Sequence, residues 1–190
     1  NLGIIGVALA NKEKGTHIIT TTIEHHAVLH SCKYLESLGF EITYLQVDKD
    51  GIVSLDDIKS ALRSNTILVS IMFGNNEVGS IQPIRELGRL LAEHQALLHT
   101  DAVQAFGVVP IDVNELNVDF LSVSGHKING PKGTGFLYSR EGSKIIPNLY
   151  GGEQERKRRA GTENVPGIVG LSNAVVLASA TLEKDRKSVV

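Results

Sequence analysis

Short apolar runs alternate along the chain with segments whose apolar residues recur at helical spacing. Runs rich in β-branched and aliphatic residues predict strands at residues 17–22, 42–47, 67–73, 96–100, 120–123 and 135–139. The run at 67–73 has no alternation of apolar and polar positions. A run of this kind is typical of a parallel strand that is covered on both faces.

Helical segments lie between these strands. Apolar spacing predicts helices that end at Gly39, begin at Ser54, and span about residues 84–94 and 165–180, the last of them long and amphipathic. Ser54 is followed three residues later by Asp57, which predicts a capped helix start. Strands separated by helices indicate an α/β fold with three layers, α/β/α, and a mainly parallel sheet.

Composition narrows the possible classes of protein. With 42% hydrophobic residues, residues 1–190 are expected to form one domain or most of one. The formal charge of -2 and pI near 6.4 give no basic field for nucleic acid. No apolar run approaches the roughly 18 to 20 residues needed to cross a bilayer, so no membrane partner is expected. Cys32 is the single cysteine and cannot form an internal disulfide, which fits a cytoplasmic protein.

Polar clusters follow four of the expected strands. They occupy residues 24–26, 74–77, 101–104 and 124–127. In open parallel sheets, ligands bind outside the carboxyl ends of the strands. Four loops at one edge of the sheet could therefore converge on one ligand.

The residue types in these loops suit pyridoxal phosphate. That cofactor needs an amine for covalent attachment, a carboxylate for its pyridine nitrogen and a flat group against its ring. Lys127 offers the amine, Asp101 the carboxylate and His25 the flat group. Ser124 and His126 offer a hydroxyl and an imidazole beside the phosphate.

Two neutral amides and one glycine complete this candidate site. Asn76 and Gln104 could donate hydrogen bonds to the phenolic oxygen, and Gly125 would let the backbone approach closely. Each candidate taken alone has an ordinary interpretation: Asp101 as a helix N-cap, Asn76 as a turn residue, Gln104 as a solvated side chain. Their shared position after successive strands is what favours a single site.

The sequence also resembles the cysteine desulfurases, a branch of the fold-type I pyridoxal-phosphate enzymes within the class V aminotransferase superfamily. The matching segments are residues 22–28, 75–83, 99–104, 124–133 and 159–164. The most specific element is the Ser-Gly-His-Lys run at 124–127 with the Gly-Pro-Lys-Gly run that follows it. The resemblance implies that residues 1–190 are the central part of a cofactor-binding large domain, a fragment without the small C-terminal domain.

The resemblance also implies roles for individual residues. Lys127 would carry the cofactor, and His25 would stack on its ring and take part in proton transfer. Asp101 would pair with the pyridine nitrogen, with Asn76 and Gln104 near the phenolic oxygen.

The phosphate contacts implied by the resemblance come from two subunits. Ser124 and His126 match phosphate ligands, and Thr162 matches a residue that reaches the phosphate of the neighbouring subunit. A homodimer is therefore the expected assembly.

The implied activity removes sulfur from L-cysteine, giving L-alanine and a persulfide for iron-sulfur cluster or thio-cofactor synthesis. The expected partners are L-cysteine and sulfur-acceptor or iron-sulfur scaffold proteins. Alternatives are a selenocysteine lyase, another class V enzyme, or a truncated, non-catalytic dimerising module. The family's phosphate-binding turn, its cysteine loop and its substrate arginine fall outside residues 1–190, and Glu153 stands where the family more usually has a third glycine.

Three other signals have structural interpretations. Cys32 lies on an apolar helix stripe, which favours a buried thiol over a nucleophile. His26 and His30 have a spacing that could hold zinc, but no third ligand is apparent and no metal site is expected. The charged run at 153–159 is expected to be a solvated loop, with a subunit interface as the functional alternative.

Overall fold

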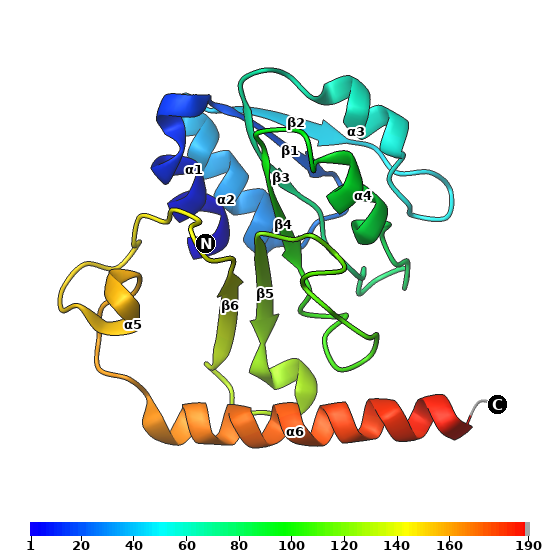
Figure 1. Cartoon of the computed structure of the whole chain (residues 1–190), viewed down its shortest axis with the longest axis vertical. Coiled ribbons are helices and arrows are strands. Elements are labelled where there is room, and N and C mark those ends of the chain that lie inside the picture. Colours follow the sequence, from blue (N-terminus) through cyan, green and yellow to red (C-terminus); the bar gives the residue numbers. More distant parts are fainter. Residues whose placement is uncertain (189–190) are drawn as a thin grey trace.

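A mainly parallel sheet forms the centre of the molecule (Figure 1). The computed structural model describes residues 1–188, with side chains up to residue 182 and that of Lys184. The strands are β1 (His17–Thr21), β2 (Glu41–Leu45), β3 (Thr66–Ser70), β4 (Leu97–Asp101), β5 (Phe120–Ser124) and β6 (Gly135–Ser139). Their order is β2-β1-β3-β4-β5-β6. All neighbours pair in parallel except β5 and β6, which are antiparallel.

Helices cover both faces of this sheet. On the two faces lie α1 (Val7–Ala10), preceded by a π-helical turn (Leu2–Gly6), α2 (His26–Ser37), α3 (Leu55–Ala61) and α4 (Ile84–Leu90). Two further helices, α5 (Gln154–Lys157) and α6 (Val165–Ser188), lie outside these layers. Figure 1 shows α1 and α2 on one side of β1 and β3, and α3 and α4 on the other. The expected three-layer α/β/α architecture is confirmed.

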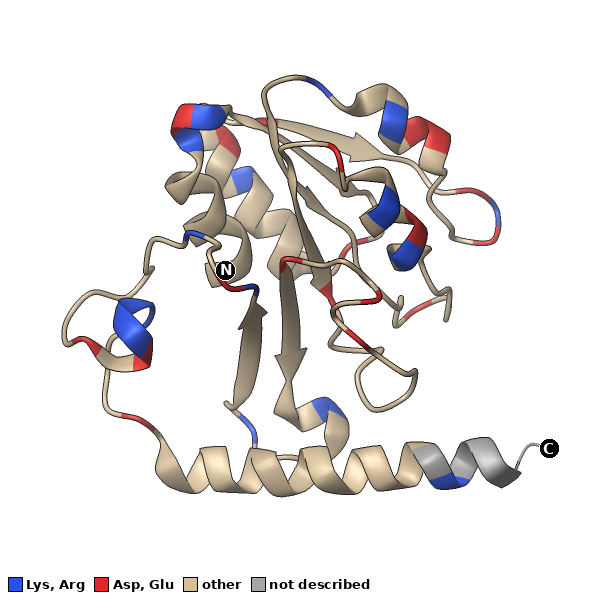
Figure 2. Ribbon diagram, in the orientation of Figure 1, with Lys and Arg blue, Asp and Glu red and all other residues tan. Residues whose placement is uncertain are grey.

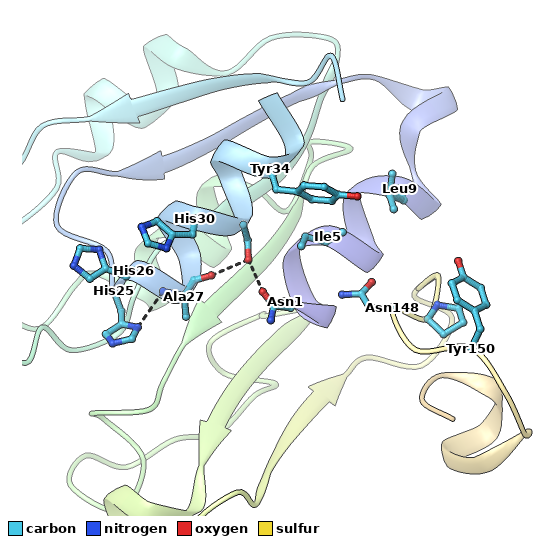
Figure 3. Close-up of a pocket in the computed structure, with 12 residues that line it drawn as sticks. Asn1, Ile5, Leu9, His25, His26, Ala27, His30, Tyr34, Asn148 and Tyr150 are labelled. Carbon is cyan, nitrogen blue, oxygen red and sulfur yellow. Dashed lines mark hydrogen bonds between the residues drawn. The ribbon is translucent and has the colours of Figure 1, made fainter. Parts of the chain in front are cut away.

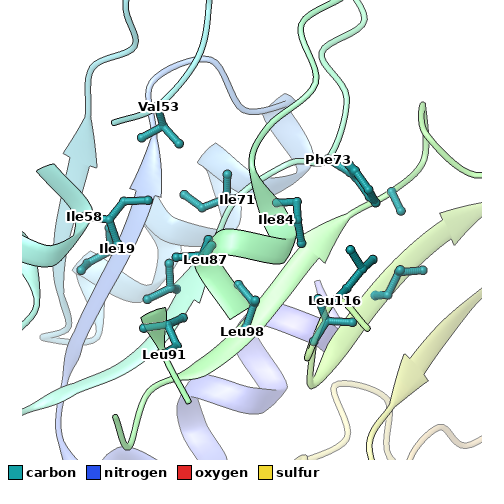
Figure 4. Packing of buried hydrophobic residues seen from close by; sticks show 14 of the residues in the cluster. Ile19, Val53, Ile58, Ile71, Phe73, Ile84, Leu87, Leu91, Leu98 and Leu116 are labelled. Carbon is teal, nitrogen blue, oxygen red and sulfur yellow. The ribbon is translucent and has the colours of Figure 1, made fainter. Parts of the chain in front are cut away.

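The two faces of the sheet carry separate hydrophobic cores. Successive side chains of a strand point to opposite faces. Ile18 accordingly packs with α1 and α2, whereas its neighbour Ile19 packs with α3 and α4. Figure 4 shows this second core, in which Ile58 and Leu87 surround Ile19. Both cores anchor the strands whose carboxyl ends carry the polar loops.

Most expected elements form, with differences at their ends. Ser54 Oγ accepts a hydrogen bond from the backbone amide of Asp57 at 3.3 Å, as the capping pattern predicts. The helix expected over 84–94 ends at Leu90. The strand expected over 67–73 ends at Ser70, although the amides of Ile71 and Phe73 still donate to β4 carbonyls.

The helix α6 differs from its expected amphipathic form. It buries Leu171 and Ala174, but its exposed apolar side chains lie all along it: Val165, Ile168, Val169, Val176 and Leu177. In Figure 2 most of the α6 ribbon is tan, the colour of residues other than Lys, Arg, Asp and Glu.

The composition of α6 also corrects an expectation drawn from the sequence. By length and composition alone, Val165–Leu182, with a mean hydropathy of 1.7, is apolar enough to cross a membrane. The expectation of no apolar run of this length was wrong, because Gly, Ala and Ser separate the aliphatic residues of this helix. One such helix is weak grounds for a membrane segment.

Candidate active site

The loops that follow β1, β3, β4 and β5 converge on one cavity of about 310 Å³. These strands are neighbours and parallel, so their carboxyl ends share one edge of the sheet. The lining residues are His25, Ala27, Met72, Gly74, Asn76, Asp101, Val103, Gln104, Ser124, His126 and Lys127. Every predicted site residue except Gly125 and Thr162 is among them.

His25 reaches the cavity from the start of α2. It is the N-cap residue of this helix, with an extended backbone conformation. Its Nδ1 atom accepts a hydrogen bond from the amide of Ala27 at 3.1 Å. This bond satisfies a free amide of the first helical turn and fixes the ring orientation.

Asp101 is the last residue of β4 and faces the cavity from the centre of the sheet. Its Oδ1 atom accepts a hydrogen bond from the amide of Val103 at 2.9 Å. Burial raises the pKa of this carboxyl, while the bond to Val103 and the charge of His25 lower it. The bond to Val103 belongs to a turn and not to the helix N-cap that was the ordinary interpretation of Asp101, and the carboxylate lies partly buried beside the cavity.

Ser124, His126 and Lys127 come from the end of β5 and the short 3-10 helix Gly125–Ile128 that follows it. Ser124 Oγ and His126 Nδ1 lie 2.7 Å apart, so the hydroxyl and imidazole orient each other. Lys127 is exposed, and its amine is accessible from solvent.

Gly125 is needed for a reason other than the expected one. It does not line the cavity. A Cβ atom at this position would lie 2.6 Å from Thr134 Oγ1 and 3.0 Å from a methyl carbon of Leu171. The glycine therefore permits close packing of the 3-10 helix against the start of β6 and against α6, rather than close approach of a ligand.

The amides of Asn76 and Gln104 reach the cavity from two loops. Asn76 is exposed and follows the buried Asn75. The turn chemistry expected of Asn76 belongs to Asn75, whose Oδ1 accepts from the amides of Glu77 and Val78 at 2.8 and 2.9 Å. The side chain of Asn76 is thereby left free for a ligand.

Thr162 lies outside this cavity. It is exposed, in the segment between α5 and α6, and lines a separate hollow of about 180 Å³ with Arg159 and Asn164. Its implied contact with a neighbouring subunit's cofactor therefore stays a prediction.

A larger cavity, of about 840 Å³, lies beside α2 (Figure 3). His25 lines both cavities, whereas His26 and His30 line only the larger one. The rings of His26 and His30 stack with their centroids 5.2 Å apart. Among the described residues, no group of three or more His, Cys, Asp or Glu side chains could hold a metal ion.

Cys32 is far from suited to nucleophilic chemistry. It is fully buried between Val28 and Leu35, as the apolar spacing predicts. Burial raises the pKa of its thiol to about 12. The thiol therefore stays protonated and has no access to a substrate.

The sequence assigned no individual role to several residues that shape the site, although all of them except Met72 lie in the polar clusters named above. Met72, Gly74 and Val103 line the cavity, and Glu24 is buried directly before His25. Two polar pairs in the sequence, Glu-His at 24–25 and Asn-Asn at 75–76, could have pointed to Glu24 and Asn75. In each pair a buried polar residue directly precedes a residue that lines the cavity.

The arrangement fits the requirements of pyridoxal phosphate. A cavity of 310 Å³ is at the lower end of the range for small-molecule sites, about 300–1,000 Å³. An accessible amine (Lys127), a half-buried carboxylate (Asp101) and an imidazole (His25) face it from three different loops. These residues could attach the cofactor, hold its ring nitrogen protonated and cover its ring.

Comparisons with known proteins agree with this chemistry. The chain matches the family described as "Aminotransferase class-V" over residues 1–188. A cysteine desulfurase IscS of Methanosarcina thermophila is 61% identical over 190 residues, which are 100% of this chain and 47% of that protein.

Solved structures show the same fold. The structure of "SspA in complex with cysteine" has a TM-score of 0.88 and 46% identity, over 92% of this chain and 51% of that chain. A NifS-like protein has a TM-score of 0.91 and 44% identity, over 96% of this chain and 50% of that chain. The chain spans about half the length of these relatives. With this match over residues 1–188 and the same fold in these structures, the chain belongs to the class-V aminotransferase family.

Proposed function

We propose that the complete protein is a pyridoxal-phosphate-dependent cysteine desulfurase and that the 310 Å³ cavity is its cofactor site. The observation that carries this proposal is the meeting of Lys127, Asp101 and His25 at one cavity, each from a different loop. When bound, the cofactor supplies a protonated ring that accepts negative charge from the carbon next to the substrate's amino group.

The chain's own residues would prepare this chemistry. Lys127 provides the amine for covalent attachment and can accept or return a proton beside the substrate carbon. Asp101 places a carboxylate in a partly buried position, where it keeps the ring nitrogen protonated. His25, whose ring is held by the amide of Ala27, would cover the ring of the cofactor.

The substrate we propose is L-cysteine, because relatives that are 61% and 56% identical bear the name cysteine desulfurase and one similar structure is in complex with cysteine. A cysteine thiolate of the complete protein would take the sulfur as a persulfide, leaving L-alanine. Cys32 cannot serve, since it is buried and its thiol is protonated. The remaining partners we propose are a second copy of the protein and a sulfur acceptor, in the cytoplasm.

The test is a titration of the chain with pyridoxal phosphate, followed by absorbance. We expect a visible band from the covalent adduct, lost on Lys127→Ala. An exposed lysine outside the cavity, Lys33, supplies the control Lys33→Ala. A band of equal strength in the Lys127→Ala chain would contradict the proposed site.

A further inference from the structure

Two buried polar side chains directly precede two residues that line the cavity. Glu24 comes before His25, and Asn75 comes before Asn76. Glu24 is 5% exposed and Asn75 is 8% exposed. The loops that carry them follow β1 and β3, which are neighbours in the sheet.

Glu24 joins the first loop to the second. Its Oε1 atom accepts a hydrogen bond from the backbone amide of Met72 at 2.8 Å and another from the hydroxyl of Thr21 at 2.8 Å. Thr21 ends β1, and Met72 follows β3 and lines the cavity. The carboxyl therefore ties the end of one strand to the cavity wall beyond the next.

Asn75 makes the return contact. Its Nδ2 donates to the carbonyl oxygen of Ile23 at 3.0 Å, so a side chain from each loop binds the backbone of the other. Its Oδ1 accepts from the amides of Glu77 and Val78, on the far side of Asn76. Asn75 therefore fixes the loop on both sides of a cavity residue.

We infer that Glu24 and Asn75 are positioning residues, which lock the loops carrying His25 and Asn76 together and so set the separation of these two side chains across the cofactor site. Neither side chain lines the cavity, so both act through the residues that follow them. This inference rests on the proposed function and deepens it.

The electrostatics indicate that Glu24 works through its oxygen rather than its charge. Burial raises the pKa of its carboxyl to about 8, and the charge of Asp101 adds to this effect. Within the described residues, Oε2 has no hydrogen-bond partner, and a charged oxygen without a partner is costly to bury. A neutral carboxyl still accepts from Met72 through Oε1. We call the two contacts, from Glu24 to Met72 and from Asn75 to Ile23, the clamp. An amide at position 24 should therefore preserve the clamp.

The experiment compares Glu24→Gln, which keeps an oxygen acceptor, with Glu24→Leu, which removes it. Affinity for pyridoxal phosphate is measured by absorbance, at a temperature where every variant is folded. We expect Glu24→Leu and Asn75→Ala each to weaken binding about tenfold and Glu24→Gln to stay within about twofold. Glu93→Gln and Glu93→Leu, at an exposed glutamate, are the matched controls.

A second readout is independent of the cofactor. Hydrogen exchange of the Met72 amide should be slow in the unchanged chain and in Glu24→Gln, and fast in Glu24→Leu. Unchanged cofactor affinity in Glu24→Leu would overturn the inference. If the unchanged chain binds no cofactor, the proposed function fails instead. In that case the inference is tested by hydrogen exchange of the Met72 amide alone. Slow exchange of this amide in Glu24→Leu would overturn the inference.

Discussion

The hydroxyl of Ser70 and Nδ1 of His99 lie 2.8 Å apart across β3 and β4, in a fully buried position. The other ring nitrogen of His99 lies 2.9 Å from the hydroxyl of Ser122 on β5. One imidazole thus bridges three parallel strands two residues before Asp101. The bridge holds together the part of the sheet that presents the carboxylate.

This bridge predicts loss of stability in acid. Burial lowers the pKa of His99 from 6.5 to about 3. On acidification the unfolded chain therefore binds the proton first, so the contribution of His99 is complete above pH 6.5 and is lost as the pH falls toward 3. Urea unfolding across this range should show a fall of a few kcal/mol that is reduced in His99→Gln. The exposed His30→Gln is the control, and equal pH slopes in all three chains would refute the prediction.

For Glu24 we predict the opposite dependence of stability on pH, with a loss of stability as the pH rises. Its folded-state pKa, about 8, lies above its ordinary value of 4.5. The contribution of the neutral carboxyl is therefore complete below pH 4.5 and is lost as the pH rises through 8. Asp101 and Cys32 are the titratable groups coupled to it. The fall in unfolding free energy between pH 4.5 and pH 8 should be smaller in Glu24→Gln, and an unchanged fall would show that another group titrates.

The Asp101→Asn variant should retain the cofactor but lose most of its rate of proton removal from the substrate. An amide cannot supply the negative charge that keeps the ring nitrogen protonated, and it can still accept from the amide of Val103. In a chain extended to the length of its relatives, exchange of the substrate's α-hydrogen should slow by about 100-fold or more. Exchange at the original rate would exclude this role for Asp101.

Cys32 should take no part in sulfur transfer. Its thiol is buried, with a pKa raised to about 12, and sulfur transfer needs a thiolate within about 3–3.5 Å of the substrate sulfur. With saturating cofactor, the 190-residue chain should form no alanine or sulfide from L-cysteine, with or without Cys32→Ser. Turnover that disappears in Cys32→Ser would show that this thiol is accessible.

Local patterns predicted the parallel sheet because β-branched runs and the polar residues after them are properties of short segments. The convergence of His25, Asp101 and Lys127 could be predicted because the carboxyl ends of parallel strands lie at the same edge of the sheet. The clamp made by Glu24 and Asn75 could not be predicted, because each contact joins residues about 50 positions apart, 48 for Glu24 and Met72. The exposure of the apolar residues of α6 likewise depends on what packs against it, which periodicity does not encode.

The proposed function depends above all on Lys127 as the residue that carries the cofactor. Borohydride reduction of the chain loaded with pyridoxal phosphate, followed by peptide mapping, tests it directly. We expect a single label on Lys127, because that residue lines the cavity with Asp101 and His25. A label on Lys132 or Lys144 instead, neither of which lines this cavity, would contradict it.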